Sequence, residues 1–189
     1  MKRILILLLL SATIISIAAP SFSAARKKGF QFSTSIGLGV GFPLAPDEFE
    51  ENWDPSFGAI LDVAVQRSLL EMSVSFDYNF FLSNGIDPDD ANILTIFLNL
   101  KIKPIAKTSV RPYILIGGGY YRFWIVDANV LENTTGYQGG AGVELDISKT
   151  QRLFIDAKQV IGRTRSHHVN STGENTSHIA VRLGLTFVF

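Results

Sequence analysis

The sequence contains no cysteine. This absence excludes a disulfide framework, a thiol nucleophile and a thiolate metal site, and it excludes lipid attachment to a cysteine near the amino terminus. The chain also lacks an excess of charge of either sign, with 17 Lys and Arg residues against 17 Asp and Glu residues. A nucleic-acid-binding protein would show a basic excess. The composition therefore predicts no nucleic-acid partner.

The sequence has a single long hydrophobic run, and it lies at the start of the chain. The basic residues Lys2 and Arg3 precede the apolar residues 4–19, and the small residues 20–25 follow. This order is typical of a cleaved secretory signal peptide. The run is shorter than the roughly 18 to 20 residues that a spanning helix needs. We expect residues 1–25 to be the signal peptide and residues 26–189 to form one domain.

The rest of the chain consists of segments in which apolar residues recur at every second position. In the last segment, Ile179, Val181, Leu183 and Leu185 alternate with small or polar residues that include Arg182. Only a β-strand places residues i, i+2 and i+4 on one face. Eight strands are predicted, over residues 30–42, 57–66, 70–82, 93–103, 110–125, 137–147, 152–161 and 178–189.

The fifth segment, residues 110–125, is apolar on both faces, so its orientation is ambiguous. We expect Tyr113, Leu115, Tyr121 and Phe123 to face outward, because the opposite set of positions contains Arg122.

Strand periodicity alone does not distinguish a soluble β-sandwich from a membrane barrel. The lengths of the connections favour the barrel, because short and long ones alternate along the chain. Short periplasmic turns and long external loops are typical of outer-membrane barrels. The short connections are residues 67–69, 104–109 and 148–151, and the long ones are 43–56, 83–92, 126–136 and 162–177. Both chain ends are then expected on the periplasmic side.

Aromatic residues are predicted to form two belts, as expected where a barrel meets the two membrane interfaces. The external belt would contain Phe42, Phe57, Tyr78, Phe80, Tyr121, Phe123 and Tyr137, and the periplasmic belt Phe30, Phe32, Tyr113, Phe187 and Phe189.

These features together resemble the outer-membrane β-barrel superfamily that includes OmpA, OmpX and the opacity proteins. The resemblance covers the eight segments, the glycine-rich residues 36–42 and 110–120, and the ending Thr186-Phe187-Val188-Phe189. It implies an all-β fold, an eight-stranded antiparallel transmembrane β-barrel in the bacterial outer membrane. It also implies that Phe187 and Phe189 form an assembly signal, with the barrel-assembly machinery and periplasmic chaperones as partners.

The faces opposite the apolar ones carry acidic and basic residues in balance. An eight-stranded barrel is just wide enough for side chains to fill it, and an unpaired charge there is costly. We therefore expect these residues to interlock as a plug. The predicted network consists of Asp62, Glu71, Asp77, Lys101, Lys103, Arg122, Glu144, Asp146, Arg152, Asp156, Lys158 and Arg182.

Two groups are expected within this network. Glu71 and Asp146 should lie with Lys101 and Lys103 toward the periplasm. The middle of the barrel should hold Asp77, Glu144, Asp156, Lys158 and Arg182.

The functional hypothesis from the sequence is a monomeric structural protein whose loops contact an extracellular ligand or host surface. A narrow pore for small solutes is one alternative. Arg163, Arg165, His167 and His168 lie in the last long connection. Cations there could meet the phosphates of lipopolysaccharide.

A lipid A hydrolase is the second alternative, because residues 166–171 resemble the lipid A deacylase family PagL. That family has a serine two residues after its histidine, whereas Asn170 stands two residues after His168 and Val169 two residues after His167. The motif is therefore incomplete. The sequence predicts no enzyme activity and no catalytic, cofactor or metal site.

Overall fold

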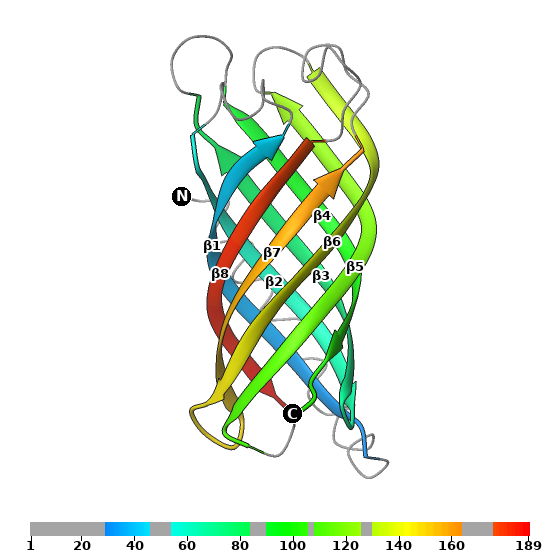
Figure 1. Cartoon of the computed structure of the whole chain (residues 1–189), viewed down its shortest axis with the longest axis vertical. Helices are drawn as coiled ribbons and strands as arrows, with labels where there is room; N and C mark the ends of the chain where they lie inside the picture. Colours follow the sequence, from blue (N-terminus) through cyan, green and yellow to red (C-terminus); the bar gives the residue numbers. More distant parts are fainter. Residues whose placement is uncertain (1–28, 46–53, 84–89, 106–107, 126–129, 164–175) are drawn as a thin grey trace.

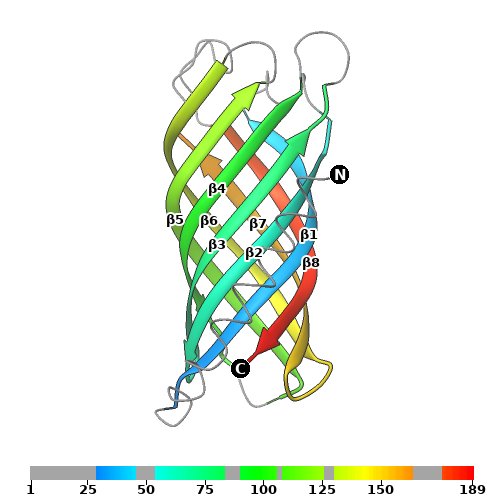
Figure 2. The same cartoon turned by 180° about the vertical axis from the view of Figure 1, so that it is seen from behind.

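The chain folds into a closed barrel of eight antiparallel strands in which sequence neighbours pair and β8 pairs with β1 (Figures 1 and 2). This computed structural model describes residues 29–45, 54–83, 90–105, 108–125, 130–163 and 176–189. The strands are β1 (Gln31–Ala45), β2 (Ser56–Arg67), β3 (Leu70–Phe81), β4 (Ala91–Ile102), β5 (Val110–Ile125), β6 (Val130–Asp146), β7 (Gln151–Gly162) and β8 (Thr176–Val188). The predicted fold class is confirmed, and the predicted signal peptide lies outside the described residues.

The described residues contain no helix that is both long and apolar enough to span a membrane.

The two ends of the barrel differ in their connections. At one end, here called the turn end, β2 joins β3 through residues 68–69 and β6 joins β7 through residues 147–150. The described chain begins at this end, and Phe189 lies there too, where its backbone N–H donates to the Phe32 carbonyl at 2.9 Å. At the opposite end, here called the loop end, β1, β3, β5 and β7 finish.

The strand bounds agree with the predicted ranges to within a few residues, except at the start of β6. That strand begins at Val130 rather than at residue 137. Its first residues include Glu132, Asn133 and Thr134, which do not alternate in hydropathy, so the pattern does not reveal them. Pairing with the end of β5, for example Arg122 with Asn133, holds them in the sheet.

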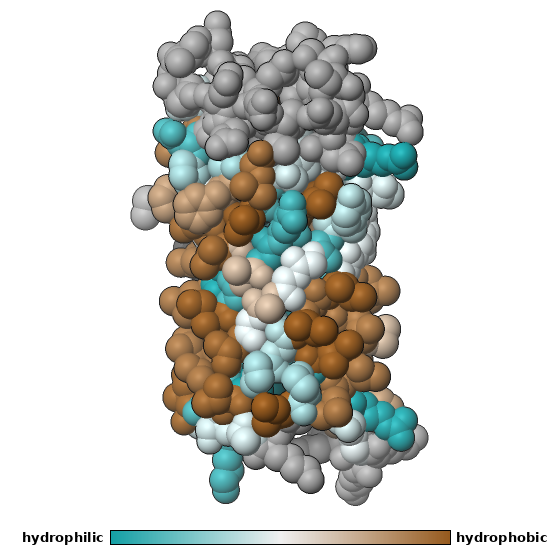
Figure 3. Space-filling view, viewed as in Figure 1, coloured by the Kyte–Doolittle hydropathy of each residue, from teal (hydrophilic) through white to brown (hydrophobic). Residues whose placement is uncertain are grey.

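The outer surface is apolar because alternate residues of each strand point away from the lumen. On β3, Leu70, Met72, Val74 and Phe76 are exposed, whereas the residues between them are buried. Figure 3 shows hydrophobic colour over much of this surface, interrupted by a narrow stripe of hydrophilic and neutral colour. The predicted outward faces are correct for all strands except β5.

The predicted orientation of β5 is wrong. Tyr113, Leu115, Tyr121 and Phe123 are buried inside the barrel, and Tyr121 is 0% exposed. Ile114, which is 56% exposed, lies on the outer face. Tyr113, Tyr121 and Phe123 therefore do not belong to the aromatic belts.

Glycines on β6 and β7 make room for these rings. A Cβ atom at Gly142, which is paired with Tyr113, would lie 2.7 Å from the Cζ atom of that ring. A Cβ at Gly162 would meet the ring of Tyr121. The lumen is narrow, and a large ring fits where the facing residue has no side chain.

Candidate functional site

The inward faces of the strands bring the predicted charged residues together in the lumen, with the exception of Arg122. Each of them lies at one of the alternate, polar positions of its strand, and these positions face the lumen. They form two clusters at different heights of the barrel, and Tyr113 contacts both, Asp156 through its hydroxyl and Lys101 through its ring.

The first cluster, here called the turn-end cluster, is built around Lys103, which follows β4. Its Nζ atom lies 2.5 Å from Glu71 Oε2 and 2.7 Å from Glu144 Oε1, and the side chain is 0% exposed. The Nζ of Lys101 lies 3.1 Å from Glu71 Oε1 and 3.5 Å from Asp62 Oδ2. Two lysines from the end of β4 and three carboxylates from β2, β3 and β6 thus share one buried layer.

Two arginines complete the turn-end cluster toward the mouth of the barrel. Arg152 contacts Glu144 Oε2 through Nη1 at 3.3 Å and Asp146 Oδ1 through Nε at 3.2 Å. Arg111 Nη2 lies 2.6 Å from Asp146 Oδ2. Asp146 therefore lies in the turn-end cluster, as expected, and its ion-pair partners there are the two arginines.

The second cluster, here called the mid-barrel cluster, is built around Arg182 on β8. Its Nε and Nη2 donate to the two carboxylate oxygens of Asp156, both at 2.7 Å, and its Nη1 lies 3.2 Å from Asp77 Oδ1. Lys158 forms a second ion pair with Asp77. The hydroxyl of Tyr113 donates to Asp156 Oδ2 at 2.7 Å. A bidentate arginine–carboxylate pair of this kind is strong and geometrically specific.

Toward the loop end, the lumen is filled by apolar side chains instead of charges. This layer consists of Phe81, Ala91, Ile93, Phe97, Tyr121, Phe123, Ile125 and Val160. The Tyr121 hydroxyl lies 3.1 Å from that of Thr176. The expectation of a polar interior was therefore incomplete, because the inward apolar residues of β4 and β5 were not recognised as lumen-filling.

Two positions in the network differ from the prediction. Glu144 belongs to the turn-end cluster, because β6 is tilted and places it beside Lys103 and Arg152. Arg122 lies on the outer face of β5, with its guanidinium carbon 5.2 Å from the centroid of the Trp124 ring.

The sequence reasoning missed Arg111, Tyr113 and His178. Arg111 takes the place of Arg122, so the ion pairs of the described lumen still involve six carboxylates and six cations: Asp62, Glu71, Asp77, Glu144, Asp146 and Asp156 with Lys101, Lys103, Arg111, Arg152, Lys158 and Arg182. His178 is fully buried, with its ring centroid 5.6 Å from that of Phe81. His178 lies an even number of residues from Arg182 on β8 and therefore on the same face, which was the signal for its inward position.

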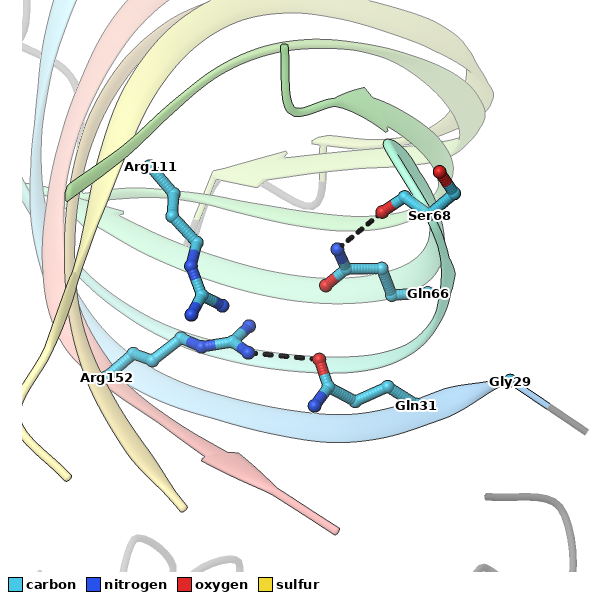
Figure 4. A pocket seen from close by; sticks show the side chains of 6 residues that line it. All are labelled: Gly29, Gln31, Gln66, Ser68, Arg111 and Arg152. Carbon is cyan, nitrogen blue, oxygen red and sulfur yellow. Dashed lines mark hydrogen bonds between the residues drawn. The ribbon is translucent and has the colours of Figure 1, made fainter. Parts of the chain in front are cut away.

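A cavity of about 340 Å³ opens at the turn end of the barrel, above the turn-end cluster. It is lined by Gly29, Gln31, Gln66, Ser68, Arg111 and Arg152. Figure 4 shows the guanidinium groups of Arg111 and Arg152 converging at one side of this mouth. Arg152 donates to Gln31 Oε1 at 3.0 Å. Arg111 and Arg152, which line this mouth, also belong to the ion pairs of the turn-end cluster.

The remaining predicted residues lie at the two ends. Phe187 and Phe189 are half-buried at the turn end, and their role as an assembly signal stays a prediction. The exposed Arg163 follows β7, and its backbone N–H donates to the Thr135 carbonyl at 3.1 Å. Arg165, His167 and His168 lie outside the described residues, as does the segment that resembles the deacylase. Within the described part of the chain, no group of three or more His, Asp or Glu residues could hold a metal ion.

Comparison with known proteins identifies the same architecture. Residues 7–189 match the family model of the outer membrane protein beta-barrel domain. The structure is similar to that of Neisserial surface protein A (TM-score 0.61, 14% identity, covering 84% of this chain and 96% of that chain). It is also similar to Ail, the attachment invasion locus protein of Yersinia pestis (TM-score 0.51, 16% identity, 84% and 98%). The N-terminal β-barrel domain of Pseudomonas aeruginosa OprF is a third similar structure (TM-score 0.50, 14% identity, 83% and 97%). Comparison with curated protein sequences finds no match.

Proposed function

Because the chain belongs to the outer membrane protein β-barrel family, we propose that it is a structural and surface-interaction protein whose barrel is sealed to solutes. Its strands span the outer membrane, its lumen is a packed core, and its loops face the exterior of the cell. The function of the protein is then contact through its external loops and not the passage of solutes through its lumen.

The observation that carries the sealed barrel is the continuous filling of the lumen. The turn-end cluster, the mid-barrel cluster and the apolar layer follow one another along the barrel axis. Lys103, Lys158 and Arg182 are each at most 5% exposed, so there is no hydrated space around the charges that a permeating ion would need. Opening a path would separate buried ion pairs, and breaking one such pair costs about 3 to 5 kcal/mol.

The surface-interaction half of the proposal rests on the loops and on one similar barrel. The connections at the loop end contain acidic residues such as Asp47 and Glu48 and the cations Arg163 and Arg165. Conserved scaffolds commonly carry binding function on such loops. The similar barrel from Yersinia pestis is named the attachment invasion locus protein, and we extend that kind of role, contact with an extracellular ligand or host surface, to this chain.

A conductance measurement tests the sealed barrel. The purified protein, reconstituted in a planar bilayer, should show no discrete conductance steps, because both ion-pair layers and the apolar layer block the lumen. A channel-forming porin reconstituted in the same bilayers is the control for insertion. Reproducible unitary steps from the folded barrel would contradict the proposal and favour the small-solute pore.

Proteolysis of intact cells tests the orientation of the barrel. Trypsin added from outside should cleave after Arg163 or Arg165, and it should not cleave after Lys149 in the turn of residues 147–150. After the outer membrane is permeabilised, cleavage at Lys149 becomes accessible. Cleavage at Lys149 in intact cells, with Arg163 and Arg165 protected, would reverse the proposed orientation. Mass spectrometry of the released peptides reads out both sites.

A further inference from the structure

Arg122 stands on the outer face of the barrel, three residues before the end of β5. The outward residues of this strand include Ile114 and Ile116, which are exposed, whereas Tyr121 and Phe123 on either side of Arg122 are buried in the lumen. A cation on a face that otherwise contacts lipid requires a physical explanation, because charge on the lipid face of a barrel is destabilising in a depth-dependent way.

The height of Arg122 places it at the membrane boundary. It lies twelve residues beyond Val110, which begins β5 at the turn end. With a rise of roughly 3.3 Å per residue and a strand tilt of about 40°, this separation spans roughly 30 Å along the barrel axis. The apolar band of such barrels is about 25 Å tall. Arg122 is therefore at the level of the lipid headgroups of the outer leaflet.

Aromatic side chains around Arg122 agree with this level. The guanidinium carbon lies 5.2 Å from the centroid of the Trp124 ring, and that ring lies 6.0 Å from the ring of Tyr78. Tyr78 in turn donates to Asn92 Oδ1. Trp and Tyr are enriched where membrane meets water. The ring of Trp124 supports one face of the guanidinium and leaves its edge available.

No carboxylate within the described chain pairs with Arg122. All six cations of the described lumen form ion pairs, whereas among the described residues Arg122 lies against the Trp124 ring and no carboxylate. Its Nε atom is covered and has no hydrogen-bond partner. The residue as a whole is partly exposed on the outer face, so its two Nη groups can donate to an anion that approaches from outside the barrel.

Asn133 adds a second donor beside Arg122. The two residues are direct cross-strand partners on β6 and β5. The hydroxyl of Tyr120 donates to Asn133 Oδ1 at 2.5 Å, which fixes the amide with its Nδ2 group free to donate. A guanidinium edge and an amide N–H side by side provide the donors that a tetrahedral anion with several acceptor oxygens binds.

We propose that Arg122, supported by Trp124 and assisted by Asn133, binds a phosphate group of lipopolysaccharide in the outer leaflet. Phosphate supplies the missing counter-charge at the level where Arg122 lies, and the planar guanidinium binds it in a bidentate manner. This site lies on β5 and β6, and the Arg163 backbone N–H donates to the carbonyl of Thr135, two residues after Asn133. It is independent of whether the lumen conducts and of what the loops contact.

Binding of lipid A to the folded protein tests the site. Trp53→Phe leaves Trp124 as the one tryptophan, and its fluorescence then reports directly on the neighbourhood of Arg122. The protein, folded in a non-ionic detergent, is titrated with diphosphorylated lipid A. We expect a saturable change in emission. Arg122→Gln should weaken the apparent affinity about ten-fold or more, because a charge-assisted hydrogen bond is lost.

The controls separate a specific site from general cationic attraction. Arg67 also stacks on a ring, with its guanidinium carbon 5.2 Å from the centroid of Phe30, but at the turn end. Arg67→Gln should leave the affinity unchanged. Arg122→Lys should bind with intermediate affinity, because an ammonium keeps the charge but cannot form the paired contact. Asn133→Ala should weaken binding several-fold without any change of charge.

Three lipids distinguish the sources of the phosphate. Lipid A stripped of its phosphates should produce no saturable change, and phosphatidylglycerol should bind much more weakly than lipid A. Equal affinity for phosphatidylglycerol would overturn the assignment to lipopolysaccharide. Unchanged affinity of folded Arg122→Gln, or equal binding of dephosphorylated lipid A to the unmodified protein, would overturn the site itself. Heat-modifiable gel mobility establishes folding of each variant. If Arg122→Gln does not fold, Arg122→Lys and Asn133→Ala decide the question, and unchanged affinity in both would refute the proposal.

Discussion

Replacing Arg182 by Gln should lower the free energy of unfolding by about 3 to 5 kcal/mol, the usual cost of breaking a buried ion pair from one side. Arg182 donates to Asp156 at 2.7 Å through two nitrogens and lies 3.2 Å from Asp77. Without its guanidinium, two buried carboxylates remain against Lys158 alone. Urea-dependent unfolding in lipid vesicles, followed by tryptophan fluorescence, measures the loss.

A matched arginine and a second substitution make this prediction specific. Arg111→Gln removes a pair of similar length, 2.6 Å to Asp146, but the Arg111 side chain is 15% exposed against 4% for Arg182. Because water reaches it, its removal should cost much less. Adding Asp156→Asn to Arg182→Gln leaves one carboxylate, Asp77, paired with one lysine, Lys158, so the charges balance. The double variant should therefore be more stable than Arg182→Gln alone. Equal losses for the two arginines, or additive losses in the double variant, would show that charge balance in the mid-barrel cluster does not set its stability.

Introducing a methyl group at Gly142 should destabilise the barrel by about 1 to 3 kcal/mol, as expected for overpacking. The new Cβ would lie 2.7 Å from the Cζ atom of Tyr113 and 2.7 Å from the backbone oxygen of Ile155. The Tyr113 ring would have to move, and its hydrogen bond to Asp156 would be strained or lost. The same urea titration applied to Gly142→Ala provides the measurement.

Gly139, which is also on β6, is the control for the loss of backbone freedom that any glycine-to-alanine substitution causes. It faces outward, and the nearest atom to a Cβ there is the backbone oxygen of Leu115 at 4.0 Å. Gly139→Ala should change the free energy of unfolding by no more than about 0.5 kcal/mol, as surface substitutions usually do. If both variants lose stability equally, the cause is the backbone freedom of glycine and not the packing of Tyr113 against Gly142.

The orientation of β5 shows where reasoning from the sequence failed and why. Both faces of this strand are apolar, and the charge of Arg122 suggested that its face should point inward. A charged residue is excluded from the lipid face only within the apolar band, but Arg122 lies near the end of β5, where a cation can face the headgroups. Glycines at the inward positions Gly142 and Gly162 were the overlooked signal, because an aromatic ring must lie opposite them to fill the lumen.

The partners within the charge network also required the structure. Parity along each strand predicts that Lys103, Glu144, Asp77 and Arg182 face inward, and they do. Their pairing across the lumen, Lys103 with Glu144 and Arg182 with Asp77, joins strands that are not neighbours in the sheet. Such contacts depend on the tilt and stagger of the closed barrel, which a single strand does not encode.

The sequence by itself determined the strands and which face of most of them is apolar and which is charged, because period-two alternation is a local property of each strand. The alternation of short and long connections then favoured a barrel over a sandwich. The tertiary structure alone decided the facing of β5, the apolar layer at the loop end, the exchange of Arg122 for Arg111 in the ion pairs, and the pairing of each charge. These depend on which side chains fit together in one narrow lumen, and that volume exists only after β8 has closed against β1.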